Sequence, residues 1–363
     1  MKILVTYATA GAGHRKCAEA IFDLLKKETN HSVSLVDFLD YTLPPFKLIY
    51  SKGYALLVTC FPSLWNFLFK LNNNPIVFRI DTPIRQALTN LLARRFINFL
   101  SREKFDCCIT TQFMVNEIIS VSKTSKNIAS KLICVVTDYN VHRVWLASGV
   151  DFYAVACRET QQRLLSLGVA EKKIKTTGIP IHVKFLTPQD KQQLLRKLGL
   201  KPNLLTVLML TGTFGFGPIK KLVLDLQDRF QLLVVCGNNH SLFNELNRIK
   251  NEHTYAYELV DNIDELMSAA DLVITKPGGQ TISEALVKHL PMLFISAIPG
   301  QETDNAKLMR GYDVGLLVEN VNKIEEIMAR FAINRHLLAY MKANTTRLRK
   351  PFAAREVIQL INE

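Results

Sequence analysis

Two side chains in the first half of the chain are of the kind that can take a proton from a reacting hydroxyl. His14 follows a glycine-rich turn at the start of a helical pattern, where the positive end of the helix dipole disfavours an imidazolium near pH 7. Asp138 follows an apolar, strand-like run, where partial desolvation raises the pKa of a carboxylate toward a useful range. Each is a candidate general base, and the other could orient it. The sequence does not assign the two roles; a framework histidine and a turn-capping aspartate are the structural alternatives.

A stretch in the second half has the residue types of a phosphate site. Lys276-Pro277-Gly278-Gly279-Gln280-Thr281-Ile282-Ser283-Glu284 lies between an apolar strand-like run and a helical pattern. Glycines let backbone N–H groups approach a ligand closely, and the free N–H groups of the first helical turn point to the same place. Glu284 lies about one turn into the helix, where its carboxylate could accept hydrogen bonds from ribose hydroxyls. A turn of this kind also occurs without a ligand.

A second glycine-rich loop precedes this stretch. Thr211-Gly212-Thr213-Phe214-Gly215-Phe216-Gly217 follows the strongly apolar run 204–210. The sequence contains neither a cluster of metal ligands nor a D-x-D triad, so we expect no metal and no cofactor. A bound diphosphate would then be held by helix N-termini and loop amides. The candidates for those amides are Gly212, Thr213, Gly278, Gly279 and Thr281.

The elements that must position these residues alternate as strand, turn and helix along the whole chain, and the pattern restarts near residue 200. This alternation predicts an α/β protein with two doubly wound, Rossmann-like domains facing each other across a cleft. Ligands of such sheets bind beyond the carboxyl ends of the strands. We expect an N-terminal domain over 1–183, a C-terminal domain over 184–345, and a C-terminal helix over 346–363 that could pack back on the first domain.

Residues 44–80 differ from the rest of the first half. They are rich in Phe, Leu, Tyr and Trp, with Lys47, Lys52 and Lys70 among them, and Pro62 interrupts any single long helix. One interpretation places them in core helices of the first domain. The other makes them a partly exposed apolar and basic surface that enters the interface of a bilayer. The next stretch, 82–99, has the periodicity of one amphipathic helix.

Composition narrows the possible partners. The chain has 363 residues, 48% of them hydrophobic, and a formal net charge of +13, which favours an anionic partner. The basic residues are scattered and form no nucleic-acid motif, so a membrane surface or a nucleotide is the better interpretation and no nucleic acid is expected. Seven cysteines without a C-x-x-C pair favour buried thiols in a cytoplasmic protein. Neither a signal peptide nor a transmembrane helix is expected.

Taken together, the motifs resemble the monogalactosyldiacylglycerol synthase and processive diacylglycerol glucosyltransferase family, in the same order over nearly the whole chain. The matching stretches are Gly11-Ala12-Gly13-His14 with Ala18, Thr137-Asp138 with His142 and Trp145, residues 177–181, residues 276–284, and Pro299-Gly300-Gln301-Glu302 with Asn305. The resemblance implies the GT-B fold, glycosyltransferase family 28, and inverting transfer of a hexose, galactose or glucose, from a UDP-sugar to the hydroxyl of diacylglycerol. It also implies a peripheral enzyme at an anionic membrane surface.

The resemblance assigns roles residue by residue. His14 and Asp138 would be catalytic, and His142 and Trp145 would bind the acceptor. Glu284 would bind the ribose, Asn238 the diphosphate or the base, and Gln301, Glu302 and Asn305 the sugar hydroxyls, although turn or cap roles are the alternative for both asparagines. The residues expected to bind the UDP-sugar are Gly11, Gly13, Gly212, Thr213, Phe214, Gly215, Asn238, Gly278, Gly279, Thr281, Glu284, Gln301, Glu302 and Asn305.

Some positions depart from the family pattern. Ala12 stands where a third glycine is usual, Cys17 where serine is common, and Thr213 interrupts a loop that is often richer in glycine. These changes leave fine substrate specificity open. The alternatives are a GT-B transferase with an undecaprenyl-linked or soluble acceptor, a UDP-GlcNAc 2-epimerase on the same fold, and a catalytically inactive sugar-nucleotide-binding protein. The sequence does not separate a galactose, glucose or GlcNAc donor.

Overall fold

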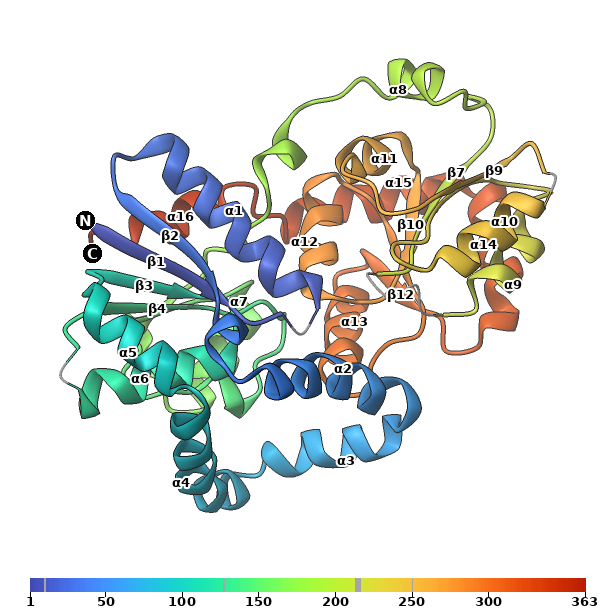
Figure 1. Ribbon diagram of the computed structural model, residues 1–363. Helices are drawn as coiled ribbons and strands as arrows, with labels where there is room; N and C mark the ends of the chain where they lie inside the picture. The colour runs from blue at the N-terminus through green and yellow to red at the C-terminus, as the bar shows by residue number, and fades with distance from the viewer. Residues whose placement is uncertain (10, 127, 213–216, 250) are drawn as a thin grey trace. The chain divides into compact units, whose positions relative to one another are not determined.

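The chain folds into two compact units, each built on one sheet (Figure 1). The computed structural model describes residues 1–9, 11–126, 128–212, 217–249 and 251–363. The first unit comprises residues 1–183, 298–301 and 350–363, and the second comprises 184–297 and 302–349. The chain therefore leaves the first unit after Val183 and returns to it twice, once for a short loop and once for its C-terminal segment.

The first unit contains a six-stranded parallel sheet with the strand order β2-β1-β3-β4-β5-β6. Its strands are β1 (Lys2–Tyr7), β2 (Ser32–Asp37), β3 (Cys107–Thr110), β4 (Lys131–Val135), β5 (Phe152–Ala154) and β6 (Ile174–Lys175). The strand order changes direction between β1 and β3, which makes that point the topological switch where doubly wound sheets bind ligands. The strands that precede the predicted site residues, β1 and β4, thus lie on either side of β3.

Helices cover both faces of this sheet, with α1 and α16 on one side and α5 and α6 on the other (Figure 1). The helices of the first unit are α1 (Ala12–Glu28), α2 (Pro44–Cys60), α3 (Pro62–Asn72), α4 (Pro75–Leu92), α5 (Arg94–Glu103), α6 (Phe113–Ser125), α7 (Arg158–Ser166) and α16 (Ala353–Gln359). Alternate residues of the strands separate the two layers: Leu4, Cys108 and Leu132 belong to the core cluster beneath α5 and α6.

The segment from α2 to α4 forms three helices, each beginning at a proline, which suits the first turn because its missing N–H has no helical partner there. α3 has no buried residue. The prediction of one helix over 82–99 was wrong: α4 begins at Pro75 and ends at Leu92, and α5 starts at Arg94. The break falls at Ala93, which is fully buried, so packing rather than a helix-breaking residue type ends α4.

The second unit has its own six-stranded parallel sheet, with the order β12-β11-β10-β7-β8-β9. Its strands are β7 (Thr206–Leu210), β8 (Gln231–Val235), β9 (Thr254–Tyr257), β10 (Leu272–Thr275), β11 (Met292–Phe294) and β12 (Gly315–Leu317). Its helices are α8 (Lys191–Lys197), α9 (Ile219–Leu226), α10 (His240–Arg248), α11 (Ile263–Ala269), α12 (Gly279–Val287), α13 (Gln301–Gly311, whose first residue lies with the first unit), α14 (Ile324–Ile333) and α15 (Arg335–Asn344).

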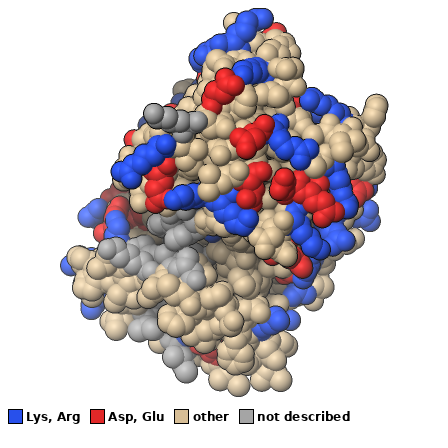
Figure 2. Space-filling view, turned by 90° about the vertical axis from the view of Figure 1, so that its right-hand side faces the viewer, with Lys and Arg blue, Asp and Glu red and all other residues tan. Residues whose placement is uncertain are grey.

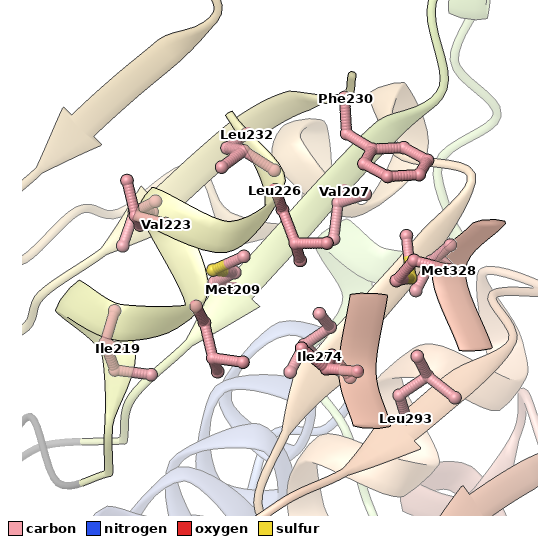
Figure 3. Packing of buried hydrophobic residues seen from close by; sticks show 14 of the residues in the cluster. Val207, Met209, Ile219, Val223, Leu226, Phe230, Leu232, Ile274, Leu293 and Met328 are labelled. Carbon is pink, nitrogen blue, oxygen red and sulfur yellow. The ribbon is translucent and has the colours of Figure 1, made fainter. Parts of the chain in front are cut away.

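The core of the second unit lies between this sheet and the helices α9, α10, α14 and α15. Figure 3 shows Ile219, Val223 and Leu226 of α9 directed at Val207 and Met209 of β7. The strand order changes direction between β7 and β10, so Gly212 after β7 and the turn at Gly278 after β10 follow neighbouring strand ends at the switch point.

The expected C-terminal helix over 346–363 is much shorter than predicted. α16 spans only Ala353–Gln359, and a turn that contains Pro351 separates it from α15. Proline lacks the N–H that a continuous helix needs and clashes with the preceding turn. Within the first unit, Arg355 of α16 forms an ion pair with Glu28 at the end of α1, and Lys131 donates to the carbonyl of Ile361 at 2.8 Å.

Gly178 is where the C-terminal segment approaches the strands most closely. Its φ is +89°, and a Cβ there would overlap the side chain of Lys350 and lie 3.2 Å from Cβ of Ala353. Gly168 has the same φ of +89° with open space around it. We expect Gly168→Ala to cost about 1 kcal/mol from the left-handed backbone alone, and Gly178→Ala to cost roughly 1–3 kcal/mol more. Urea unfolding of both variants measures the difference in the free energy of unfolding. Equal losses of stability would show that the C-terminal segment can move away from residue 178 without cost.

The surface and the thiols agree with the composition. Figure 2 shows Lys and Arg side chains intermingled with Asp and Glu over the upper part of one face rather than gathered in a single basic patch. All seven cysteines are free, and all except Cys60 are buried. None of the helices within the described ranges is both long and apolar enough to span a bilayer.

Candidate active site

His14 lies in the first turn of α1, and two threonines from neighbouring strand ends hold its ring. Nδ1 is 2.7 Å from the carbonyl oxygen of Thr111 and 3.0 Å from Oγ1 of Thr137. Thr111 also donates from its hydroxyl to the carbonyl of His14 at 2.9 Å. Thr111 directly follows β3, and Thr137 lies two residues beyond β4. The imidazole is therefore fixed at the switch point of the first sheet.

These contacts define which nitrogen of His14 carries the proton. A carbonyl oxygen can only accept, so Nδ1 must be the protonated nitrogen, and Nε2 keeps its lone pair. Nε2 makes no hydrogen bond within the described ranges of the chain. Burial lowers the pKa of His14 to about 4, and the bond to Thr111 opposes that shift without cancelling it. The ring is thus a neutral proton acceptor across the physiological range.

His14 and Asp138 both line one cavity in the first unit. The cavity has a volume of about 740 Å³ and mostly apolar walls contributed by α2 and α3. Its lining residues are His14, Phe46, Ile49, Tyr50, Gly53, Leu57, Trp65, Leu68, Phe69, Asn72, Asp81, Arg85, Gln112, Phe113, Asp138, Asn140, His142, Val144, Trp145 and Gln301. A base and a carboxylate therefore meet an apolar space large enough for part of a lipid.

Asp138 does not orient His14, because the partners of the imidazole are the two threonine oxygens. Its carboxylate is 7% exposed, and Gln301 donates to Oδ1 at 3.4 Å. Nε2 of His14 keeps a lone pair without a hydrogen bond within the described ranges, whereas Asp138 accepts from Gln301. Gln301, expected at the donor sugar, lies with the first unit and contacts this carboxylate.

The two residues expected to bind the acceptor, His142 and Trp145, both line the cavity. Trp145 is 2% exposed, and its ring centroid is 6.2 Å from that of His14. Both nitrogens of His142 are occupied: Nε2 donates to the carbonyl of Phe69 at 2.7 Å, and Nδ1 accepts from the backbone of Val144 at 3.2 Å. Burial also lowers its pKa. His142 therefore ties α3 to the loop after β4 and is not free to exchange protons.

Gly300 packs against the same phenylalanine. Its φ is +92°, and a Cβ there would lie 2.5 Å from Cδ1 of Phe69. The ring of Phe69 in turn lies 4.3 Å, centroid to centroid, from His142. The glycine thus lets the loop that carries Gln301 approach α3 closely, which explains why this position has no side chain.

The donor candidates of the second unit gather at its switch point. α12 begins after Gly278, and its first helical bond runs from Ile282 N–H to the carbonyl of Gly278 at 3.0 Å. The N–H groups of Gly279 and Thr281 precede that bond and remain available to an anion. Glu284 is 3% exposed and accepts from Nε2 of Gln280 at 3.2 Å. The side-chain oxygen of Gln280 is buried and has no hydrogen-bond partner among the residues that the structure describes.

The remaining donor candidates differ in their surroundings. Asn305 is fully buried and donates to the carbonyl of Pro277 at 3.1 Å, which connects α13 to the loop before α12. Asn238 is exposed, and its neighbour Asn239 caps α10 instead. Glu302 is buried in the first turn of α13. Gly212 follows β7 with a φ of +69°. Thr213, Phe214 and Gly215 lie outside the described residues.

Gly11 and Gly13 stand at the start of α1, with Gly11 as its N-cap and Gly13 in its first turn. They belong to the first unit, together with His14. In the described part of the chain, no three His, Cys, Asp or Glu side chains converge as a metal site requires.

Three residues of this region were not selected from the sequence: Tyr50, Thr111 and Gln112. Thr137 was part of the matching stretch around Asp138 but was given no role of its own. Thr111 and Gln112 follow β3 as directly as Asp138 follows the end of β4. The rule that ligands bind beyond strand ends could therefore have found them. Tyr50 carried no such signal, because it is one aromatic residue among many in α2.

Comparison with known proteins finds one family model for each half of the chain. A family model described as monogalactosyldiacylglycerol (MGDG) synthase matches residues 14–181, and one described as glycosyltransferase family 28 C-terminal domain matches residues 206–350. A processive diacylglycerol beta-glucosyltransferase of Staphylococcus epidermidis is 27% identical over 98% of this chain and 91% of the relative. A processive diacylglycerol beta-glucosyltransferase of Bacillus pumilus is 27% identical over 100% of this chain and 94% of the relative. The chain belongs to the monogalactosyldiacylglycerol synthase and processive diacylglycerol glucosyltransferase family.

Membership confirms the enzyme class expected from the sequence, a UDP-sugar-dependent hexosyltransferase. Solved structures confirm the fold class, GT-B. MurG of Acinetobacter baumannii, at 14% identity, matches with a TM-score of 0.63 over 99% of both chains. A UDP-GlcNAc 2-epimerase of Neisseria meningitidis, also at 14% identity, matches with a TM-score of 0.63 over 100% of both chains. At these identities the likeness concerns the fold alone.

Proposed function

We propose that this enzyme transfers a hexose, galactose or glucose, from a UDP-sugar to the hydroxyl of diacylglycerol with inversion at the anomeric carbon. The observation that carries the proposal is a mostly apolar cavity lined by His14, a residue whose Nε2 makes no hydrogen bond within the described ranges. A lipid that ends in a hydroxyl matches both features, because its chains fill apolar walls and its hydroxyl needs a base. The relatives named as diacylglycerol glucosyltransferases support the same acceptor.

The proposed reaction proceeds by a single displacement. Nε2 of His14 takes the proton of the acceptor hydroxyl while its oxygen attacks the anomeric carbon of the sugar. The bond from that carbon to the UDP oxygen breaks, and UDP leaves with the electron pair. Asp138, which lines the same cavity, would supply negative charge to the imidazolium that forms. Thr111 and Thr137 keep Nδ1 occupied, so that only Nε2 can accept the proton.

The second unit is proposed to bind the donor. The N-terminus of α12, with the amides of Gly279 and Thr281, would hold the diphosphate, and Glu284 would accept from the ribose hydroxyls. Glu302 would take part in sugar binding, whereas the observed bond of Asn305 to Pro277 gives that residue a role in shaping the loop. The structure of a protein of this fold bound to UDP, HepE of Anabaena, supports a UDP site. The proposed reaction needs no metal, so adding EDTA to the assay should leave the rate of transfer unchanged.

Access to the acceptor is proposed to occur at an anionic membrane surface. α2, α3 and α4 expose apolar side chains, among them Ile49, which is 68% exposed and also lines the cavity. The other large exposed side chains of these helices are Leu48, Leu56, Leu64, Phe67, Leu71, Ile76, Ile80 and Leu91, and Leu43 and Phe61 next to them are exposed too. Residues 43–80 contain no Asp or Glu, but they contain three lysines and Arg79. In Figure 2 the lower end of the face shows few Lys, Arg, Asp or Glu side chains.

The decisive experiment supplies diacylglycerol vesicles with labelled UDP-galactose, UDP-glucose or UDP-GlcNAc. Lipid-soluble label identifies the donor and the acceptor together. Label that stays in the aqueous phase as an isomerised sugar nucleotide would instead indicate the 2-epimerase reaction of the fold neighbour. Transfer to an undecaprenyl-linked or soluble acceptor, with none to diacylglycerol, would replace the proposed acceptor.

Membrane docking makes a separate prediction. Phe67 is 60% exposed on α3, and replacing it by serine is expected to weaken binding to vesicles that contain anionic lipid by about fivefold to tenfold, because an exposed aromatic loses its apolar contact with the bilayer. Ile333→Ser on α14 is the control, since that side chain is 85% exposed in the other unit. Vesicle sedimentation at low and high salt measures both. Equal binding by the two variants, or no weakening with salt, would contradict docking through α2 to α4.

A further inference from the structure

Tyr50 of α2 and Gln112 form a hydrogen-bonded pair in the wall of the cavity that contains His14. Nε2 of Gln112 lies 2.8 Å from the phenolic oxygen of Tyr50. Gln112 follows Thr111, the residue whose carbonyl holds Nδ1 of His14. The phenol is therefore tied, through two consecutive residues, to the same strand end that positions the base.

The orientation of the Gln112 amide follows from its second contact. Oε1 of Gln112 accepts the backbone N–H of Val115 at 3.1 Å and so caps α6. A backbone N–H can only donate, which places the oxygen of the amide on Val115 and its NH₂ on Tyr50. Gln112 is fully buried and has no room to exchange these contacts. Nε2 therefore donates to the phenol, and the phenolic oxygen is the acceptor of this bond.

The Tyr50 proton is consequently free for a ligand. The hydroxyl makes no other hydrogen bond within the described ranges of the chain. Burial raises the pKa of Tyr50 far above its ordinary value, so the group stays a phenol and acts as a donor. A buried donor without an acceptor is unfavourable, and in an apolar cavity the bound molecule is what can supply one.

The acceptor lipid of the proposed function has groups that suit such a donor. Apart from the hydroxyl that reacts, diacylglycerol has two ester carbonyl oxygens close to it, and its remaining surface is hydrocarbon. An ether-linked glycerolipid has the same hydroxyl and similar chains but lacks these carbonyls. A donor in the cavity wall can therefore distinguish the two lipids, whereas apolar walls cannot.

We propose that the Tyr50 hydroxyl, oriented by Gln112, donates a hydrogen bond to an ester carbonyl of the acceptor and so selects ester-linked over ether-linked glycerolipids. This inference rests on the proposed diacylglycerol acceptor. Tyr50 is a positioning residue in this scheme: it holds the lipid so that the hydroxyl faces His14, and it takes no part in the bond changes.

The test compares two lipids with matched chains, a 1,2-diacylglycerol and the corresponding 1,2-dialkylglycerol, in the wild-type enzyme and in Tyr50→Phe. The wild type should prefer the ester lipid by about threefold to tenfold in kcat/KM. Tyr50→Phe should lose most of that preference, through a higher KM for the ester lipid and unchanged turnover of the ether lipid. Tyr153→Phe is the control, because it removes a buried hydroxyl that bonds to Ala147 outside the cavity.

The outcomes separate this inference from the proposed function. Failure of the wild type to use diacylglycerol at all would remove the proposed acceptor. If the wild type uses it, equal losses on both lipids in Tyr50→Phe would mean that the phenol serves only packing or contacts the reacting hydroxyl, and either result overturns the selection of an ester. A change in the ester-to-ether ratio in Tyr153→Phe would show that the ratio reports general loss of packing and would overturn it too.

Discussion

Replacing His14 by alanine is expected to lower kcat for transfer to diacylglycerol by about a thousandfold, with little change in KM for either substrate. The reason is that Nε2 carries the only free lone pair of an imidazole whose other nitrogen is held by Thr111 and Thr137. Without it, the acceptor hydroxyl must lose its proton to water or to a poorly placed carboxylate. Initial rates with saturating donor and lipid measure the effect.

Two controls separate the chemical role of His14 from a structural one. His14→Gln can still donate to the carbonyl of Thr111 but has no basic nitrogen, so it should be as inactive as the alanine variant while melting closer to the wild type. Added imidazole should restore part of the activity of His14→Ala and none of that of His14→Gln, whose side chain fills the space. A loss smaller than about tenfold in both variants would exclude His14 as the base.

The pH dependence follows from the same burial. The pKa of His14 is lowered to about 4, so the imidazole is neutral above that value and becomes protonated, and inactive as a base, only as the pH falls through it. The acid limb of kcat/KM that reports the free enzyme should therefore lie near pH 4 to 5 rather than near the ordinary histidine value of about 6.5. An acid limb close to pH 6.5 would instead show that water reaches the imidazole of His14 in solution.

The second large effect is expected in the donor unit. Glu284→Ala should raise KM for the UDP-hexose by about tenfold to a hundredfold, because hydrogen bonds from hydroxyls to a buried carboxylate are stronger than neutral ones. Glu284 is 3% exposed within α12, and its observed partner is the amide of Gln280. The change in kcat should be small, since the ribose is remote from the bonds that change.

Donor analogues make this prediction specific to the ribose. The wild type should bind UDP-hexoses that lack the 2′- or the 3′-hydroxyl of the ribose more weakly than the complete donor. Glu284→Ala should show no further loss with the analogue that lacks the contacted hydroxyl. Independent losses for both analogues and the variant would place the role of Glu284 in supporting the helix rather than in contacting the nucleotide.

Strand positions and turn residues could be read from the sequence because their signals are local. Apolar runs followed by glycine or a polar residue correspond to β1, β4, β7 and β10, and the restart near residue 200 matches the second sheet. The two helix predictions that were wrong, over 82–99 and 346–363, have different reasons. Pro351 is a local signal in the sequence that a helix over 346–363 should be interrupted. Ala93 is a good helix former, and only its burial in the folded protein marks it as the boundary between α4 and α5.

The nature of residues 44–80 was open in the sequence because apolar helices look alike whether they are buried or exposed. The structure supports parts of both interpretations. Tyr50 and Phe46 pack against the core cluster of the first unit, whereas α3 has no buried residue and Phe67 is exposed. The same segment thus builds the wall of the cavity and presents apolar side chains to the outside.

The fold class and the order of the two units could be predicted from the sequence, and Gly278, Gly279, His14 and Asp138 could be selected as candidate site residues, since each of these signals depends on residue types close together in the chain. The hydrogen bonds that hold His14 and Tyr50 depend on the tertiary structure. The oxygens that fix the tautomer of His14 come from residues 97 and 123 positions away, and the amide that orients Tyr50 lies 62 positions away. Hydrogen bonds between such distant residues exist only after the strands have paired, so no local pattern could have predicted them.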